Sequence, residues 1–243
     1  MFLSVALLSK LWPHAKPGVV AGISGSSVDA LTKYPMTLEE LQDFFAQCSE
    51  ETGGGMVFVE SGHYSAERAH EVWPSRFPTV QSAQVIVGDE RRLFNMTYGD
   101  RMGNRPGTDD GYDFRGQGMI QLTGRDWFTL VGKDTGLDLV NHPELAASAA
   151  TMLVCALSYW KIAKVNETVG DFTRETIRVN GGTTNMAARL AWRAKCQEII
   201  TAQSLATQAP MPSPPFVQKA NDASLSIHPS LLAEIEQVLL RWF

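Results

Sequence analysis

Apolar residues recur at helical spacing over most of the chain between about residues 4 and 203, and glycine-rich loops separate the helical segments. The clearest helix begins after Thr37, whose hydroxyl can cap the first turn. The apolar positions that follow are spaced by three, one and three residues: Leu41, Phe44, Phe45 and Cys48. The pattern ends at the glycine triplet 53–55, so the sequence predicts one helix between Thr37 and these glycines.

The same patterning predicts the other elements. Helices are expected at residues 2–8, 66–73, 84–95, 143–160 and 185–202. Turn-forming residues over 99–113 predict a long loop. Alternation with interleaved glycines over 114–124 predicts a short strand or hairpin beside a cleft. The expected domain is therefore mainly helical, with a small β element.

Composition changes after residue 203, which divides the chain into a main domain over 1–203 and an appendage over 204–243. The proline-rich stretch 208–215 indicates an extended linker. The final segment is amphipathic, with apolar positions at Leu231, Ile235, Val238, Leu239 and Trp242. We expect this helix to dock on the main domain. Contact with a partner or a membrane surface is the alternative, which its few basic residues disfavour.

Composition excludes several classes of protein. A hydrophobic content of 44% and a charged content of 19% exclude a disordered chain. The formal net charge of -5 disfavours nucleic acid as a partner, because binding phosphates needs a basic surface. No apolar run reaches the roughly 18 residues of a membrane span, so we expect no stable membrane insertion. We expect the chain to act as a monomer.

The cysteines Cys48, Cys155 and Cys196 lie far apart, each in an apolar helical pattern. An odd number without CxxC spacing predicts buried free thiols rather than disulfides or a zinc site. The five histidines have no metal-ligand spacing, so no metal site is expected. The apolar stretch 2–8 lacks the flanking features of a signal peptide, and we expect a first helix in a chain made in the cytoplasm.

Helical spacing singles out one carboxylate, Glu51, because positions 41, 44, 48 and 51 form one stripe. Glu51 thus extends the buried face of its helix, and Glu50 points about 100° away. Partial burial, the helix C-terminus and the neighbouring Glu50 all disfavour the ionised form of Glu51. A carboxyl that stays protonated near neutral pH suits a general acid. Spacing alone leaves open that both residues are ordinary solvated side chains.

Glu60 follows nine residues later, across a glycine-rich turn. Two carboxyls joined by a turn can face each other over a cleft, where one protonates a leaving oxygen and the other activates water. Glu67 and Glu71 are four residues apart and more simply form a solvated helix face. The Asp109–Asp110 pair lacks the further ligand spacing of a calcium loop.

The segment FFAQCSEETGGGMVFVESGHYS (44–65) resembles the catalytic-glutamate segment of the family 19 glycoside hydrolases, and in particular of their phage endolysin branch. Further similar segments follow in the family's order: YSAERAHEVWPSRFP (64–78), YGDRMGN (98–104), YDFRGQGMIQLTGRDWF (112–128) and VNGG (179–182) with Arg189. Together they extend over about residues 4–200. The resemblance implies a mainly α, lysozyme-like α+β fold with two helical lobes and a small β element at the cleft.

The resemblance also implies roles for individual residues. It places the general acid at Glu51, in agreement with the stripe, and the second carboxylate at Glu60. Thr123 matches the hydroxyl residue that helps to hold the attacking water. The implied reaction is hydrolysis with inversion of a β-1,4 bond next to an N-acetylated sugar, and it needs no metal or organic cofactor.

Five further residues are expected to bind substrate. Gln121 matches a sugar-contacting glutamine, Asn180 the asparagine of the NGG block, and Arg189 a basic residue that supports the acidic pair. Tyr112 and Trp127 flank the glycine-rich block and could stack on sugar faces, with a role in the core as the alternative.

The sequence departs from the family pattern at three positions. Glu50 stands where relatives usually have histidine, Gly55 where they have a large residue, and Trp127 where many plant chitinases have asparagine. These departures concern the details of substrate binding and leave the two carboxylates in place.

The expected substrate is peptidoglycan, with chitin as the alternative for the same chemistry. A non-catalytic glycan-binding or wall-associated protein is a second alternative, disfavoured because such a protein needs no acid pair. A toxin-like effector exported by a dedicated machine is a third. The expected site of action is the cell wall, in the periplasm, after release from the cytoplasm.

Overall fold

The computed structural model describes residues 1–205, and these residues are mainly helical, as predicted. The elements are α1 Val5–Leu11, α2 Val19–Lys33, α3 Leu38–Thr52, α4 Ala66–Val72, α5 Val80–Gln84, α6 Glu90–Tyr98, α7 Asp110–Asp113, α8 Arg125–Thr135, the 3₁₀ turn η1 Pro143–Ala147, α9 Met152–Ile162, the 3₁₀ turn η2 Val165–Thr168, α10 Phe172–Asn180, α11 Met186–Ile199 and α12 Ala202–Leu205. The predicted linker and C-terminal helix lie outside the described residues.

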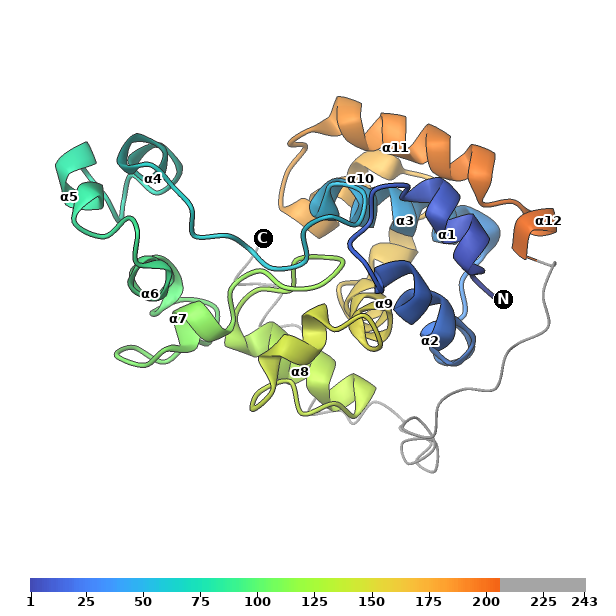
Figure 1. The fold of residues 1–243 in the computed structure, drawn as a ribbon, viewed down its shortest axis with the longest axis horizontal. Helices are drawn as coiled ribbons and strands as arrows, with labels where there is room; N and C mark the ends of the chain where they lie inside the picture. Colours follow the sequence, from blue (N-terminus) through green and yellow to red (C-terminus); the bar gives the residue numbers. More distant parts are fainter. Residues whose placement is uncertain (206–243) are drawn as a thin grey trace.

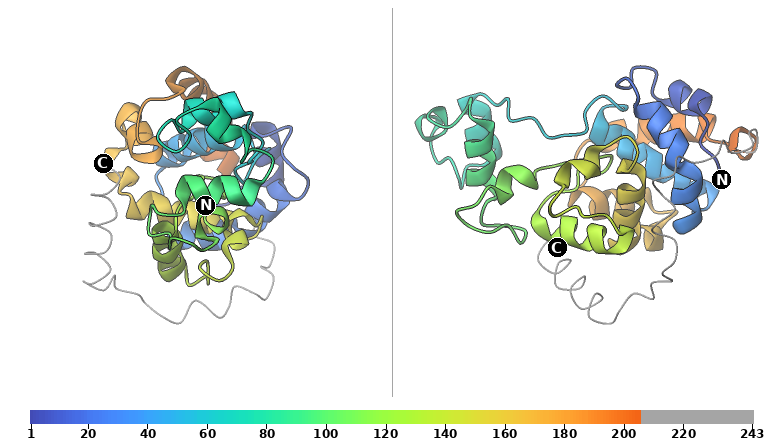
Figure 2. Two further views of the ribbon diagram at one scale, coloured as in Figure 1. Left: turned by 90° about the vertical axis from the view of Figure 1, so that its left-hand side faces the viewer. Right: turned by 60° about the horizontal axis from the view of Figure 1, so that its bottom comes forward.

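The helices form two lobes (Figure 1). In the larger lobe, α3 lies among α1, α9, α10 and α11, and its most extensive packing is against α11. The smaller lobe contains α4, α5 and α6 around a separate apolar cluster that includes Trp73, Phe77 and Leu93. The extended segment 57–65, called the linking segment below, crosses from one lobe to the other, as the right-hand view of Figure 2 also shows.

Helix α3 has the boundaries that its sequence predicts. The Thr37 hydroxyl accepts a hydrogen bond from the Glu40 amide, and Gly53 ends the helix in the left-handed conformation. The stripe residues Leu41, Phe44 and Cys48 are fully buried. Burying such large apolar side chains stabilises the fold by roughly 1.5–3 kcal/mol each, so the stripe fixes which side of α3 faces the core.

The packing of Trp12 explains why position 55 is a glycine and not a large residue. Gly55 has a φ of +85°, and a β-carbon placed there would lie 2.8 Å from the Trp12 ring. The Trp12 indole is fully buried and donates to the Ser49 hydroxyl over 2.8 Å. The Lys16 amide also donates to the Gly55 carbonyl. The N-terminal segment thus fills the space that a large side chain at position 55 would need.

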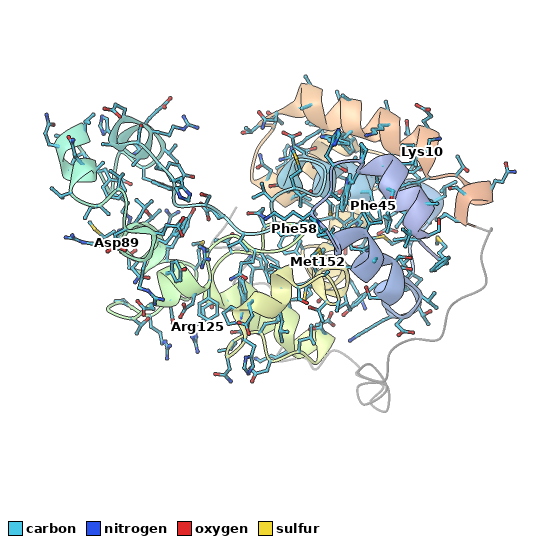
Figure 3. The ribbon with its side chains drawn as sticks, in the orientation of Figure 1. Lys10, Phe45, Phe58, Asp89, Arg125 and Met152 are labelled. Carbon is cyan, nitrogen blue, oxygen red and sulfur yellow. The ribbon has the colours of Figure 1, made fainter. Side chains whose placement is uncertain are left out.

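The β element is smaller than the predicted strand or hairpin. Within the described residues it consists of isolated antiparallel bridges, from Val59 to Gln117 and from Gln117 to Leu122. The Gly118 amide also donates to the Phe58 carbonyl. Phe58 is buried in the core of the larger lobe and anchors the start of the linking segment there (Figure 3).

Three predicted helices are wrong in their extent. The segment 143–160 is split into η1 and α9, because Ser148 adopts an extended conformation with a ψ of 135°. The segment predicted at 84–95 is interrupted at Gly88, whose φ is +98°, so α5 and α6 flank that glycine instead. The first helix begins at Val5, after Ser4 caps it, and not at residue 2.

The three cysteines are buried and free, as predicted. Among residues 1–205, no helix combines the length and the apolar character that a membrane crossing requires.

Replacing Gly55 with alanine should destabilise the fold more than the same change at Gly18. Both glycines have a positive φ, but the β-carbon at position 18 would meet nothing within 4 Å. Gly18→Ala should therefore cost about 1 kcal/mol for its conformation alone. Gly55→Ala should cost ~1–3 kcal/mol more, because it also crowds Trp12. Chemical denaturation of the two variants measures the difference, and equal losses would contradict the packing described for Trp12.

Candidate active site

Glu51 lies in the last turn of α3 and is largely buried, with 17% of its side chain exposed. The Arg189 guanidinium donates to its Oε1 over 2.7 Å from α11. The structure thus joins two residues that are 138 positions apart and that the sequence had assigned to one site. The stripe on α3 correctly predicted that Glu51 is turned inward.

Arg189 is almost fully buried, and its donors have three partners, two on α3 and one in the loop before α11. Besides Glu51, it donates to the Gln47 side chain over 2.6 Å and to the Thr184 carbonyl over 3.1 Å. Gln47 in turn donates to the Thr176 hydroxyl of α10. Sequence reasoning missed Gln47; its signal was its position four residues before Glu51, on the same side of α3.

The pKa of Glu51 is raised above its usual value, chiefly because burial penalises the ionised carboxylate. The nearby charge of Glu50 raises the pKa further. The Arg189 charge and its hydrogen bond oppose both effects without cancelling them. Glu51 is therefore a carboxyl that retains its proton to a higher pH than an exposed glutamate does.

Glu60 lies in the linking segment and is held by two donors from other elements. The Tyr98 hydroxyl at the end of α6 donates to Oε1 over 3.0 Å, and the Gly116 amide donates to Oε2 over 3.1 Å. Burial is the largest influence on Glu60 and raises its pKa, while these two bonds and the charge of Arg115 lower it. Sequence reasoning missed the contribution of the Tyr98 hydroxyl.

Gln121 lies in the turn between the bridged residues Gln117 and Leu122, and Thr123 follows Leu122 directly. A β-carbon on Gly116 would lie 2.7 Å from Gln121 Oε1 and 3.3 Å from Glu60 Oε2, so both side chains lie against that glycine. Gln121 has a φ of +52°, a strained backbone conformation for a non-glycine residue. The Thr123 hydroxyl donates to the Gln121 carbonyl over 2.8 Å. The structure thus brings Gln121 beside Glu60, as the sequence predicted for one site.

The two aromatic residues expected to stack on sugars are already in contact with other side chains. Two guanidinium groups lie over the Tyr112 ring, with Arg115 at 4.0 Å and Arg91 at 4.5 Å from the ring centre. Trp127 is buried against Tyr159, with ring centres 4.5 Å apart. A role in binding sugar remains a prediction for both rings.

Asn180 is exposed at the end of α10 and donates to the Gly182 carbonyl. This places it in the same turn region as Thr184, whose carbonyl accepts from Arg189. Its expected role in binding sugar also remains a prediction.

An open pocket of about 710 Å³ lies elsewhere, over α6 and the loop that follows it. Four of its charged residues form ion pairs, Arg76 with Asp100 and Arg91 with Asp109, and none of the predicted site residues lines it. In the described part of the chain, no group of three or more histidine, cysteine, aspartate or glutamate side chains could hold a metal ion.

Comparison with known proteins connects this site to one family. The model of the class I chitinase family, glycoside hydrolase family 19, matches residues 22–174. A family 19 domain-containing protein from Haemophilus influenzae is 30% identical over 185 residues, which cover 75% of this chain and 89% of the relative. An acidic 27 kDa endochitinase from Solanum lycopersicum is 42% identical over 64 residues, or 26% of each chain.

Solved structures share the fold at low sequence identity. Chitinase C from Streptomyces griseus superposes with a TM-score of 0.54 at 16% identity, over 82% of this chain and 92% of that one. A class IV chitinase from Zea mays gives 0.55 at 17% identity, over 87% and 96%. The family match covers most of the described residues, so the two buried carboxyls lie in a domain of a known enzyme family. The chain belongs to glycoside hydrolase family 19 and is a glycosidase with a chitinase-like fold.

Proposed function

We propose that this chain cleaves the β-1,4 bonds of peptidoglycan by a single inverting displacement. The observation that carries the chemistry is the pair of buried carboxyls with different partners, one beside a guanidinium and the other beside neutral donors. Glu51 acts as the general acid and protonates the glycosidic oxygen. Its raised pKa keeps the proton available, and Arg189 stabilises the carboxylate left after the transfer.

Glu60 acts as the general base and takes a proton from the attacking water. Each of its oxygens accepts one hydrogen bond from the protein and has a further lone pair free for water. Thr123 already donates its hydroxyl hydrogen to the Gln121 carbonyl, so its oxygen can accept the second hydrogen of the water. The water would then present a lone pair to the anomeric carbon.

Peptidoglycan is proposed as the substrate because the segment 44–65 resembles that of phage endolysins. Chitin is the second candidate, and the relatives and structures named as chitinases favour it. The two polymers share a β-1,4 bond next to an N-acetylated sugar, so the same pair of carboxyls suits both. A non-catalytic, glycan-binding role has no support from the comparisons.

Digestion of purified peptidoglycan and of chitin oligomers, with mass spectrometry of the products, tests the choice of substrate. Muropeptides with a new reducing muramic acid are the expected result. Cleavage of chitin oligomers alone would overturn the peptidoglycan proposal and leave the acid/base mechanism in place. Cleavage of neither polymer would overturn both.

The variant Glu51→Gln should lose about 10²–10⁴-fold in rate, because glutamine keeps the shape but has no transferable proton. The fold should be retained, which circular dichroism checks. The neighbouring Glu50→Gln is the matched control and should clear permeabilised cells at nearly the normal rate. An inactive Glu50 variant beside an active Glu51 variant would contradict the assignment of the acid.

The first sugar product should have the α configuration. A β-linked substrate gives an inverted product when water attacks directly from the face opposite the leaving group. Proton NMR during the first minutes of digestion, before the anomers equilibrate, measures this. An initial β product would indicate a retaining mechanism. It would exclude Glu60 as the general base of a single displacement.

Removing the Tyr98 hydroxyl should move the acidic limb of kcat/KM to higher pH. Tyr98→Phe takes a donor away from the ionised form of Glu60, so the pKa of that carboxyl should rise. The base is then protonated, and inactive, at a pH where it is ionised in the unaltered protein. The control is Tyr34→Phe, which removes a tyrosine hydroxyl that bonds Asp134 instead. An acidic limb that does not move in Tyr98→Phe would show that this bond does not tune the base.

A further inference from the structure

In the larger lobe, polar side chains on successive turns of α3 meet arginines on successive turns of α11. On α3 they recur every four residues: Glu39, Asp43, Gln47 and Glu51. On α11 Arg189 and Arg193 are also four residues apart, so they project from the same side of that helix. Arg189 binds Gln47 and Glu51 at the active site. Arg193 binds Asp43, one turn further back along α3.

Behind the active site, the fully buried Asp43 forms an ion pair with Arg193, whose side chain is partly exposed. Asp43 is 0% exposed and accepts from Arg193 Nε over 2.6 Å and from Nη2 over 3.0 Å. The exposed Glu39 lies 3.5 Å from the same guanidinium. The arginine also covers the Phe172 ring of α10, 5.0 Å from its centre. The guanidinium of Arg193 on α11 thus contacts both α3 and α10.

A second buried acid, Glu175 of α10, lies beside this pair. It is 0% exposed, and neither of its oxygens accepts a hydrogen bond of normal geometry within residues 1–205. The groups that face it are Asp43 from α3 and Arg193 from α11, with the Gly170 amide nearby. Two fully buried carboxyls beside one guanidinium balance in charge only if one of them carries a proton. We name Asp43, Glu175 and Arg193 the buried cluster.

We propose that the buried cluster holds one proton between its two acids and positions Arg189 on Glu51. A protonated Glu175 can donate to the Asp43 carboxylate, which satisfies an acid that otherwise lacks a donor. The cluster then fixes how α10 and α11 are placed against α3. The proposal rests on the proposed function only in giving Glu51 the role of the acid.

Two contacts carry this placement to the active site. The residue after Glu175 is Thr176, whose hydroxyl accepts from Gln47, the residue that binds Arg189. The loop after α10 supplies the Thr184 carbonyl that accepts from Arg189 Nε. A shift of α10 or α11 would therefore move the guanidinium beside the acid.

The shared proton has a consequence for stability. Burial and the charge of Asp43 raise the pKa of Glu175 to about 8 in the folded chain, whereas an exposed glutamate titrates near 4.3. The folded state therefore holds a proton that the unfolded state has lost, and stability must fall as pH rises between these two values. Above about pH 8 the loss should level off.

The experiment on positioning uses Arg193→Lys, which keeps the positive charge but loses the bidentate hydrogen bond to Asp43. If Arg193 positions Arg189, the cation beside Glu51 should be displaced, and the titration midpoint of Glu51 should rise by about 1 pH unit. Carbon-13 NMR of the glutamate carboxyls measures this without substrate, with Glu51→Gln to assign the signal. The kcat value should fall about tenfold, with KM little changed.

The matched control is Arg174→Lys, at an exposed position on α10, which should alter neither quantity. A lower melting temperature with an unchanged Glu51 midpoint would show a merely structural role and overturn the positioning. Since the NMR readout needs no turnover, failure to cleave any glycan would count against the proposed function and not against this proposal.

The experiment on the shared proton uses Glu175→Gln, whose amide can donate to Asp43 at every pH. The decline in melting temperature between about pH 5 and 8 should become shallower than in the unaltered chain. The control Glu167→Gln, at an exposed residue of η2, should keep the original slope. An unchanged slope in Glu175→Gln would overturn the shared proton. This variant also keeps the proposal testable if Arg193→Lys does not fold.

Discussion

The buried guanidinium of Arg189 is the interaction on which the rest of the site depends. A charged group removed from water is costly unless its donors are all directed at acceptors. Here the acceptors come from α3 and from the loop after α10, so satisfying the arginine fixes three segments at once. Glu51 is one of these acceptors. The orientation of the acid therefore follows from the packing of α3 against α11 and not from the helix end alone.

Burial and ion pairing act on Glu51 in opposite directions, and this opposition suits a residue that gives up a proton. Burial alone would leave a carboxylate that is hard to form, whereas a strong ion pair alone would leave no proton to give. Glu60 has no such partner in contact and depends instead on neutral donors from Tyr98 and Gly116. The same residue type thus has two environments, as an acid and a base in one site require.

The local sequence pattern predicted the features that depend on a single helix. The stripe through Leu41, Phe44 and Cys48 placed Glu51 on the inner side of α3, and Thr37 and Gly53 gave the helix ends. These depend on spacing and capping, which are visible in sequence. The resemblance to a known family then supplied Glu60, which spacing alone could not distinguish from other glutamates.

Features decided by packing between distant segments were not predictable in this way. Tyr98 binds Glu60 across 38 positions, and Gln47 meets Arg189 across 142. The break at Ser148 interrupts a segment whose apolar pattern continues on both sides. No local signal reports which partner a buried polar group will find, because the partner depends on how the helices pack.

The most direct test of the account is the crystal structure of the Glu51→Gln variant with an N-acetylated β-1,4 oligosaccharide bound. The account predicts that the side chain at position 51 lies within hydrogen-bond distance of the glycosidic oxygen. It also predicts a water held by Glu60 and Thr123 on the opposite face of the sugar, with the two carboxyl positions about 6.5–9.5 Å apart. A sugar bound away from both residues would contradict the account, and so would a separation near 5 Å that leaves no room for water.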